Sequence, residues 1–308
     1  MVKLSVMIGK LKLGNPVMVA SGTFGYAREF ESLVDLKKLG AIVTKTITQR
    51  PRAGNPPPRI VETPAGMLNS IGLQNEGVDS FLKNKPAFLF NIGVPIITSI
   101  AGDTIKEYAY LAKALTGCGV SALEINISCP NVIHGGKGKK TVGLIAQDAK
   151  ATFSVVKAVR QATKLPIITK LSPNVTDITT IAKAAKDGGT DALSLINTFY
   201  GMSIDINTRR PRLGNVIGGV SGPAIRPMAV KMVLDVKRAV NLPIIGMGGI
   251  MDTKDALEFI IAGASAIALG TANFINPHAA EEIVTGIEKY LKENRISDIN
   301  KLIASINI

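Results

Sequence analysis

Two lysines stand at the ends of short apolar segments, where a charged side chain is unusual. Lys45 ends "AIVTK" and Lys170 ends "PIITK". Burying an ammonium group among apolar residues is costly unless the group meets an anion or a ligand. The alternative is a lysine whose aliphatic stem crosses the apolar layer and whose charge reaches water. Because the two lysines occupy equivalent positions, we favour contact with a ligand.

Cys129 follows another apolar segment, within "LEINISCPN", and is one of two cysteines in the chain. An isolated cysteine often packs as a small apolar side chain. Nearby lysines lower the pKa of a thiol, however, and the thiolate can then act as a nucleophile or a base. His134 is close in sequence, so a Cys–His pair for acyl transfer stays open. A base that removes a proton from carbon fits better with a site that also holds an anion and two cations.

Asparagines form a third group at the ends of the apolar segments and in one long loop. They are Asn69, Asn126, Asn131 and Asn197. A single asparagine in such a place is commonly a turn residue. Four of them together favour a planar substrate with adjacent carbonyl and N–H groups, because a neutral amide both donates and accepts hydrogen bonds.

Glycines end the last two apolar segments, in "GMGG" and "LGT". The residues concerned are Gly248, Gly249, Gly270 and Thr271. Glycine lets the backbone approach a ligand closely, and exposed N–H groups attract anions. The pair of loops therefore predicts a phosphate site, whereas either loop alone could be an ordinary turn.

A regular fold must position these residues, and the apolar pattern predicts one. Short apolar runs alternate with segments of helical period, several of which begin at Thr or Asp and end at Gly. Strands that are apolar on both faces and alternate with helices indicate a parallel sheet covered by helices. The predicted strands cover residues 17–21, 41–45, 95–100, 122–127, 166–171, 192–197, 243–248 and 266–270. Eight such units predict an α/β fold, a single (β/α)8 TIM barrel domain over residues 1–308, with an open doubly wound sheet as the alternative.

In a barrel of this kind the loops that follow the strands form the active site, and every residue named above lies in or beside such a loop. Two segments, 47–89 and 198–225, are longer than a helix requires and are rich in Pro and Gly. We predict that both are small insertions at the C-terminal face of the strands. Loops of that length are usually functional, and extra strands forming a small cap are an equally open and compatible interpretation.

Composition narrows the class of protein. Two cysteines and two histidines in 308 residues predict free thiols in a reducing compartment, and neither a disulfide framework nor a metal site. Lysines interrupt the N-terminal segment, and no apolar run is long enough to span a bilayer, so we expect a cytoplasmic protein with no membrane association. The net charge of +13 is spread over the predicted helices and aromatic residues are scarce, which favours anionic ligands over nucleic acid.

Taken together, the motifs resemble those of the dihydroorotate dehydrogenase family, in particular the catalytic subunit of the NAD-linked class 1B type. The resemblance extends from Val17 to Phe274 and rests on "VASGTFG", "VTKTIT", "NSIGLQNEG", "NISCPN", "KLSPNVTDI", "LINT", "GGVSGPAI", "GMGGI" and "ALGTANF". It implies a barrel that binds FMN and oxidises (S)-dihydroorotate to orotate in pyrimidine (UMP) biosynthesis. Cys129 would remove the C5 proton while the C6 hydride passes to FMN, and Lys45 would lie between flavin and substrate.

The same resemblance implies the binding residues. Those for the flavin would be Ala20, Ser21, Lys45, Thr46, Ser99, Asn126, Lys170, Ile196, Gly222, Gly248, Gly249, Gly270 and Thr271. Those for dihydroorotate or orotate would be Lys45, Asn69, Ser70, Ile71, Gly72, Leu73, Asn126, Asn131, Asn197 and Thr198. Lys170 would stabilise negative charge on the reduced flavin.

The NAD-linked class implies a partner. A second subunit with FAD and a [2Fe-2S] cluster would pass electrons to NAD, since this chain has neither cluster cysteines nor a dinucleotide-binding βαβ unit. We expect a homodimer of this chain and a heterotetramer with that iron–sulfur flavoprotein. Cys129 and the short N-terminus disfavour the membrane-attached class, which carries serine as the base. A fumarate-linked class 1A enzyme and a dihydropyrimidine dehydrogenase-like module remain alternatives.

One segment departs from the family pattern. After "SCPNV" the sequence continues "IHGGKGKKTVGLIAQD", which is longer and more basic than the family segment. The resemblance implies that this loop folds over the substrate as a lid.

Overall fold

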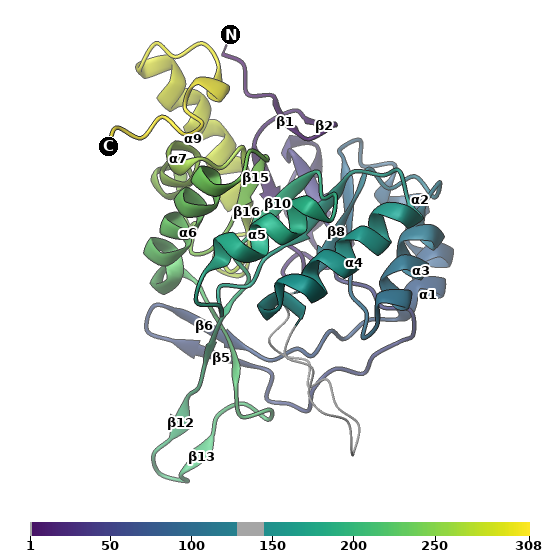
Figure 1. The fold of residues 1–308 in the computed structure, drawn as a ribbon. Helices are drawn as coiled ribbons and strands as arrows, with labels where there is room; N and C mark the ends of the chain where they lie inside the picture. The colour runs from purple at the N-terminus through teal and green to yellow at the C-terminus, as the bar shows by residue number, and fades with distance from the viewer. Residues whose placement is uncertain (1, 128–144) are drawn as a thin grey trace.

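The computed structural model describes residues 2–127 and 145–308. Eight parallel strands form a closed barrel at its centre (Figure 1). They are β3 (Val17–Val19), β4 (Ala41–Val43), β7 (Ile96–Ile100), β8 (Ala122–Asn126), β9 (Ile167–Lys170), β10 (Ala192–Leu195), β15 (Ile244–Gly246) and β16 (Ala266–Leu269). The first and last barrel strands pair, with Ile267 beside Val17 and Leu269 beside Val19. This pairing confirms the predicted barrel and excludes the open sheet.

The strands are buried on both faces, as their apolar sequences require. Every residue of β3, β4, β7, β8, β9, β10, β15 and β16 is buried. One set of alternate side chains fills the barrel, and the other set packs against the surrounding helices. All eight strands were predicted, and each lies within its predicted range.

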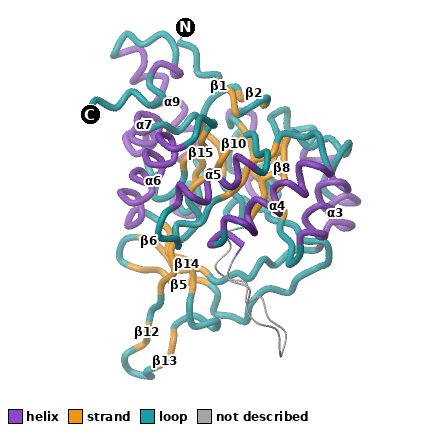
Figure 2. Tube along the Cα trace, viewed as in Figure 1, coloured by secondary structure: helices purple, strands orange, loops and turns teal. Residues whose placement is uncertain are grey.

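Amphipathic helices cover the barrel (Figure 2). They are α3 (Ile105–Leu115), α4 (Ala149–Ala162), α5 (Ile178–Asp187), α6 (Arg226–Ala239), α7 (Thr253–Ala262) and α9 (Ala279–Glu293), with the short α8 (Ala272–Ile275) before α9. Thr104, Asp148, Asp177 and Asp252 accept backbone hydrogen bonds as N-caps of α3, α4, α5 and α7. The predicted Thr and Asp start signals are therefore confirmed at α3 and α5.

The connections after the first two barrel strands differ from those after the other strands. After β3 come only the 3-10 turns η1 (Arg28–Phe30) and η2 (Leu36–Lys38), and after β4 comes the long insertion with α1 (Gly77–Asn84) and α2 (Pro86–Leu89). Further 3-10 turns are η3 (Ile145–Gln147), η4 (Pro223–Ile225) and η5 (Ile299–Lys301).

The two predicted insertions join in a second, antiparallel sheet in the order β11-β14-β6-β5. Its strands are β5 (Ile60–Thr63), β6 (Gly66–Asn69), β11 (Phe199–Gly201) and β14 (Gly218–Ser221). Val61, Leu68 and Leu213 form a separate small core beneath it. The interpretation as a small cap of extra strands is thus confirmed.

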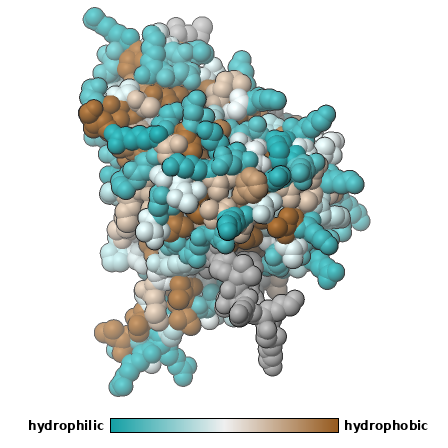
Figure 3. Space-filling view, viewed as in Figure 1, coloured by the Kyte–Doolittle hydropathy of each residue, from teal (hydrophilic) through white to brown (hydrophobic). Residues whose placement is uncertain are grey.

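A two-stranded arm, β12 (Ile204–Asp205) and β13 (Arg210–Pro211), projects from this second sheet at the lower left of Figure 1. Ile204 and Ile206 on the arm are exposed, and apolar groups stand out there in Figure 3.

The hairpin of β1 (Val6–Ile8) and β2 (Leu11–Leu13) lies at the opposite end of the barrel from the second sheet (Figure 1). Gly9 in its turn has φ of 58° and approaches Asp191, which precedes β10. No helix within residues 2–127 and 145–308 is long and apolar enough to cross a membrane.

Candidate active site

A cavity of about 360 Å³ opens at the carboxyl end of the barrel strands. The predicted residues that line it come from both insertions and from the ends of seven of the strands. They are Ala20, Ser21, Lys45, Thr46, Asn69, Ile71, Gly72, Leu73, Asn126, Lys170, Ile196, Asn197, Thr198, Gly222, Gly248, Gly249, Gly270 and Thr271. This is where a (β/α)8 barrel carries its chemistry.

Two predicted residues lie behind the cavity wall. Ser99 is fully buried, and its hydroxyl is 2.9 Å from Thr46 Oγ1, which is a lining residue. Ser70 is also fully buried, and its Oγ accepts a hydrogen bond from Asn55 Nδ2 at 2.9 Å. Ser99 thus supports the wall through Thr46, and Ser70 anchors the loop that carries Ile71 to Leu73. The ligand contacts expected of these two serines stay predictions.

Cys129 and Asn131 lie outside the described residues, as do His134 and the basic segment 135–140. Asn126, at the end of β8, is the last cavity residue before that segment.

Glycines shape one end of the cavity. Gly249 has φ of 75°, and a Cβ placed on it would meet the carbonyl oxygen of Gly222 at 2.7 Å. A Cβ on Gly248 would meet Ala229 Cβ at 2.9 Å. Gly270 differs, because its Cβ would have Thr23 Cγ2 as its nearest neighbour, at 3.9 Å. Packing against neighbouring protein atoms therefore requires glycine at positions 248 and 249, whereas the backbone of Gly270 is open beside the cavity, which suits an anion such as a phosphate.

The two predicted lysines meet in the same cavity. Lys170 ends β9 and is 6% exposed. Lys45 follows β4 and is half-buried, and its backbone N–H donates to the carbonyl of Gly25 at 2.8 Å. Both lysines line the wall, as expected for side chains that contact a ligand.

Amides line the other part of the cavity. Asn126 Nδ2 donates to Thr46 Oγ1 at 3.2 Å, and the Asn126 carbonyl accepts from the hydroxyl of Tyr108 at 3.0 Å. Asn69 Nδ2 is 3.4 Å from the carbonyl of Gly219, across the β6–β14 pair. Asn197 Oδ1 accepts from the N–H of Thr198 at 2.8 Å. These contacts hold three amides in fixed positions around one space.

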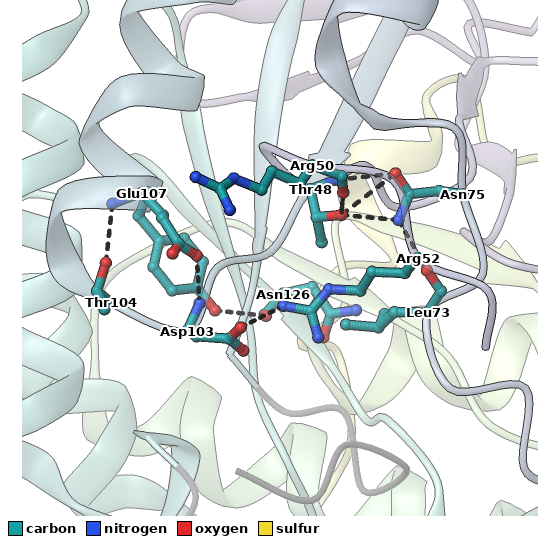
Figure 4. A network of polar contacts seen from close by, with 10 residues as sticks. Thr48, Arg50, Arg52, Leu73, Asn75, Asp103, Thr104, Glu107 and Asn126 are labelled. Atoms are coloured by element: carbon teal, nitrogen blue, oxygen red, sulfur yellow. Dashed lines mark hydrogen bonds and ion pairs between the residues drawn. The ribbon is translucent and has the colours of Figure 1, made fainter. Parts of the chain in front are cut away.

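A polar network supports the loop that follows β6 (Figure 4). Asn75 Nδ2 donates to the carbonyl of Leu73 at 2.7 Å, and Asn75 Oδ1 accepts from the N–H groups of Gly77 at 2.8 Å and Thr48 at 3.2 Å. Gly72 and Leu73 have φ of 74° and 57°, a left-handed conformation that such contacts must hold in place. Asn75 was not among the predicted residues, although it belongs to the quoted "NSIGLQNEG" motif.

Apolar side chains complete the wall and were also missed. They include Ile60, Met67, Met247, Ile250, Met251 and Phe274. In the sequence these residues are indistinguishable from core residues, and only the fold shows that they face a cavity. Within the described residues, no group of His, Cys, Asp and Glu could hold a metal ion.

The cavity therefore combines three environments. A glycine-lined end suits an anion, apolar walls suit a planar ring, and an end with lysine and amides suits a small polar substrate. Such an arrangement can hold an anionic group, a planar ring and a small polar ligand in one space.

Comparison with known proteins agrees with this geometry. Residues 3–291 match the family described as "Dihydroorotate dehydrogenase". A protein of Trichlorobacter lovleyi is 56% identical over 304 residues (98% of each chain), and one of Desulforudis audaxviator is 55% identical over 305 residues (99% of this chain and 97% of the relative). A protein of Thermoanaerobacter sp. (strain X514) is 54% identical over 305 residues, 99% of each chain. All three are named dihydroorotate dehydrogenase B (NAD(+)), catalytic subunit, and this chain belongs to the dihydroorotate dehydrogenase family.

Proposed function

We propose that this chain is the FMN-dependent catalytic subunit of an NAD-linked dihydroorotate dehydrogenase, which oxidises (S)-dihydroorotate to orotate in pyrimidine biosynthesis. The observation that carries the proposal is one cavity lined by glycine-rich loops, two lysines and three asparagine amides. Full-length similarity to subunits of that name supports the same conclusion.

The cavity residues fit FMN. Gly248, Gly249, Gly270 and Thr271 would hold its phosphate, because all four line the cavity and the backbone of Gly270 is open there. Ala20, Ser21, Thr46, Ile196 and Gly222 would contact the ring and ribityl chain. Lys170 would lie at the ring itself. When bound, FMN supplies a two-electron acceptor.

The lysine and amide end fits dihydroorotate. Lys45 would pair with its carboxylate, and the amides of Asn69, Asn126 and Asn197 would contact its ring N–H and carbonyl groups. The backbone of Ile71, Gly72 and Leu73, held by Asn75, would close the carboxylate site. Asn131 and Thr198 are assigned to the same substrate by the family resemblance.

Two residues would act on the reaction directly. The Cys129 thiolate would take the proton from C5 as the hydride leaves C6, so that the C5–C6 single bond becomes the double bond of orotate. The ammonium group of Lys170 would stabilise the negative charge that arrives with the hydride. Apolar residues such as Met247 and Ile250 would exclude water from the reacting atoms.

The electrons would leave through a partner. We propose a homodimer of this chain in a heterotetramer with a subunit that carries FAD and a [2Fe-2S] cluster and reduces NAD. The words "catalytic subunit" in the names of the relatives support the existence of a second subunit.

Anaerobic mixing of the purified protein with dihydroorotate tests the proposal. We expect a yellow protein whose flavin absorbance near 450 nm (roughly, a general flavin property) is bleached by dihydroorotate and not by dihydrouracil. Preference for dihydrouracil would favour the dihydropyrimidine dehydrogenase-like alternative. A colourless protein that does not take up FMN would contradict the proposal altogether.

Reoxidation of the reduced protein tests the class. We expect slow recovery of the absorbance with fumarate, and recovery with NAD only when the partner subunit is added. Rapid reoxidation by fumarate alone would indicate the class 1A enzyme.

A further inference from the structure

A buried carboxylate inside the barrel has no role in the function proposed so far. Glu124 lies in the middle of β8 and is 1% exposed. Side chains alternate along a strand, so Glu124 faces the same side as Asn126, which lines the cavity. Glu124 therefore points into the barrel, one layer below the cavity floor.

The hydrogen bond of Glu124 fixes where its carboxylate lies. Oε2 accepts from Ser194 Oγ on β10 at 2.9 Å. Strand β9 lies between β8 and β10 in the barrel. The side chain of Glu124 must therefore cross the inner face of β9 to reach Ser194.

The register shows which residues of β9 it crosses. Glu124 is beside Ile168, and Lys170 is beside both Asn126 and Ser194. The carboxylate thus passes between the level of Ile168 and that of Lys170. Lys170, which the family resemblance places at the flavin ring, is the last residue of the strand that this carboxylate crosses.

One oxygen of this carboxylate is unsatisfied. Oε1 of Glu124 is buried and has no hydrogen-bond partner among residues 2–127 and 145–308. An ionised carboxylate in an apolar interior is costly unless a positive charge compensates it. Lys170, 6% exposed, is the cation on the adjacent strand, and no direct ion pair between the two is found in the described part of the chain. Their attraction would act through the interior of the barrel, whose low dielectric strengthens it.

We propose that Glu124 is a positioning residue: an ionised carboxylate inside the barrel that compensates the charge of Lys170 and thereby tunes the reduction potential of the flavin. The charge pairing concerns only residues of this chain. Its effect on the flavin rests on the proposed function.

A double-mutant cycle tests the charge pairing. Unfolding midpoints are measured on the full-length chain at matched flavin content for wild type, Glu124→Gln, Lys170→Met and the double variant. Lys170→Met should lower the midpoint markedly, because it leaves an unpaired buried carboxylate. Adding Glu124→Gln should restore most of that loss, since neither charge then remains.

Additive effects of the two changes would overturn the proposal, because they would mean that Glu124 is neutral or independent of Lys170. If Lys170→Met does not fold, recovery of soluble protein in the double variant would show the same rescue by removal of the unpaired carboxylate. Lys170→Arg is the matched control, because it keeps the positive charge. In the Lys170→Arg background, Glu124→Gln should change the unfolding midpoint by about as much as it does in the wild type.

The reduction potential of the bound flavin gives the second readout. Glu124→Gln removes a negative charge below the ring, so reduction should become easier by about tenfold in its equilibrium constant, or about 30 mV for a two-electron couple. Thr98→Val is the control, because it removes a buried hydroxyl on the neighbouring strand β7 that has no hydrogen-bond partner within the described part of the chain. Thr98 is next to the inward-facing Ser99, so its own side chain points away from the barrel interior. Its potential should equal that of the wild type.

An unchanged potential in Glu124→Gln would overturn the proposal. A protein without flavin would instead contradict the proposed function, and the double-mutant cycle would still decide whether the charges are paired.

Discussion

The two ends of the barrel are built from the same strands and differ in what those strands carry. At the amino end, the Arg160–Asp191 ion pair and the β1–β2 hairpin hold strands and loops together. At the carboxyl end, the same strands end in lysine, asparagine and glycine around a cavity. Strand β8 shows the change within five residues, from Ala122 at one end to Asn126 at the other. On the strands that reach the cavity, the contacts that hold the fold together and the proposed site residues therefore lie at different ends, and substitutions at the two ends should affect different measurements.

The largest expected effect is on the chemical step at the carboxyl end. Cys129→Ala should keep flavin bound and slow its reduction by dihydroorotate by about 10²- to 10⁴-fold, because a positioned base typically contributes that much. Stopped-flow absorbance measures the rate. Cys129→Ser should be milder if the hydroxyl can accept the proton.

Cys118 is the matched control, since it is the other cysteine and precedes β8 at the amino end. Its Sγ is 3.1 Å from the carbonyl of Leu115, and burial raises the pKa of its thiol. Cys118→Ala should leave the rate of flavin reduction unchanged. Equal rates in Cys129→Ala and wild type would refute the role of Cys129 as the base.

The second prediction separates stability from binding within the carboxyl end. Gly249→Ala should lower both the unfolding free energy, by about 1–3 kcal/mol, and the affinity for FMN, because φ is positive and the added Cβ meets a backbone oxygen. Gly270→Ala should weaken FMN binding only, since its Cβ would point into open space. Thermal unfolding and flavin titration measure the two quantities.

Gly14→Ala serves as the control, because a Cβ there has no neighbour within 4 Å and lies far from the cavity. Normal FMN affinity in both Gly249→Ala and Gly270→Ala would argue against a phosphate site at these loops.

A third prediction concerns the amino end alone. Asp191 Oδ2 accepts from Arg160 Nη1 at 2.9 Å and from the N–H of Ile167 at 2.8 Å. Asp191→Ala should lower the unfolding free energy by about 2 kcal/mol, because it removes charge-assisted hydrogen bonds from a partly buried site. Flavin affinity and the reduction rate of the folded protein should not change. A slower chemical step at full flavin occupancy would show that the two ends are coupled.

The smallest effect should appear at the chain ends. Lys3 Nζ is 2.9 Å from Asp298 Oδ2, and this contact, opposed in part by desolvation, lowers the pKa of Asp298 to about 2. A lowered pKa in the folded state stabilises the protein above the unfolded pKa near 4, and that contribution is lost as the pH falls toward 2. Because Lys3 is exposed, the contribution should be below about 1 kcal/mol. Unfolding of Asp298→Asn between pH 5 and pH 2 should show a weaker pH dependence than wild type, and an identical profile would contradict the assignment.

The same contrast explains what the sequence could predict. The barrel strands were predictable because each is a short apolar run buried on both faces, and the N-caps of α3 and α5 carry Thr104 and Asp177 as local signals. The glycines, lysines and asparagines of the cavity were found because such residues are unusual at strand ends. The sheet formed by the two insertions could not be settled, since β6 pairs with β14 across 150 residues and no local pattern encodes that pairing.

Other site residues were hidden for different reasons. Met247 and Ile250 look like core residues in a linear sequence. Asn75 acts through the loop that it holds in place. The role proposed for Glu124 can be inferred only when β8, β9 and β10 are known to lie side by side. Residues that act by positioning other residues can be recognised only in the three-dimensional structure. Residues that depart from the apolar pattern of the strands can be recognised in the sequence.

The pairing of β16 with β3 has a consequence for the order of events during synthesis. A ribosome releases β3 early, but its partner strand emerges only near the end of translation, as do Gly270 and Thr271. Lys45 and Asn69 are therefore synthesised long before Gly270 and Thr271. These two residues complete the cavity wall only when about nine-tenths of the chain has been made. A nascent chain that stalls before β16 lacks the strand that closes the barrel and the cavity residues that follow it. Under the proposed function, uptake of FMN would therefore report that translation has passed this strand.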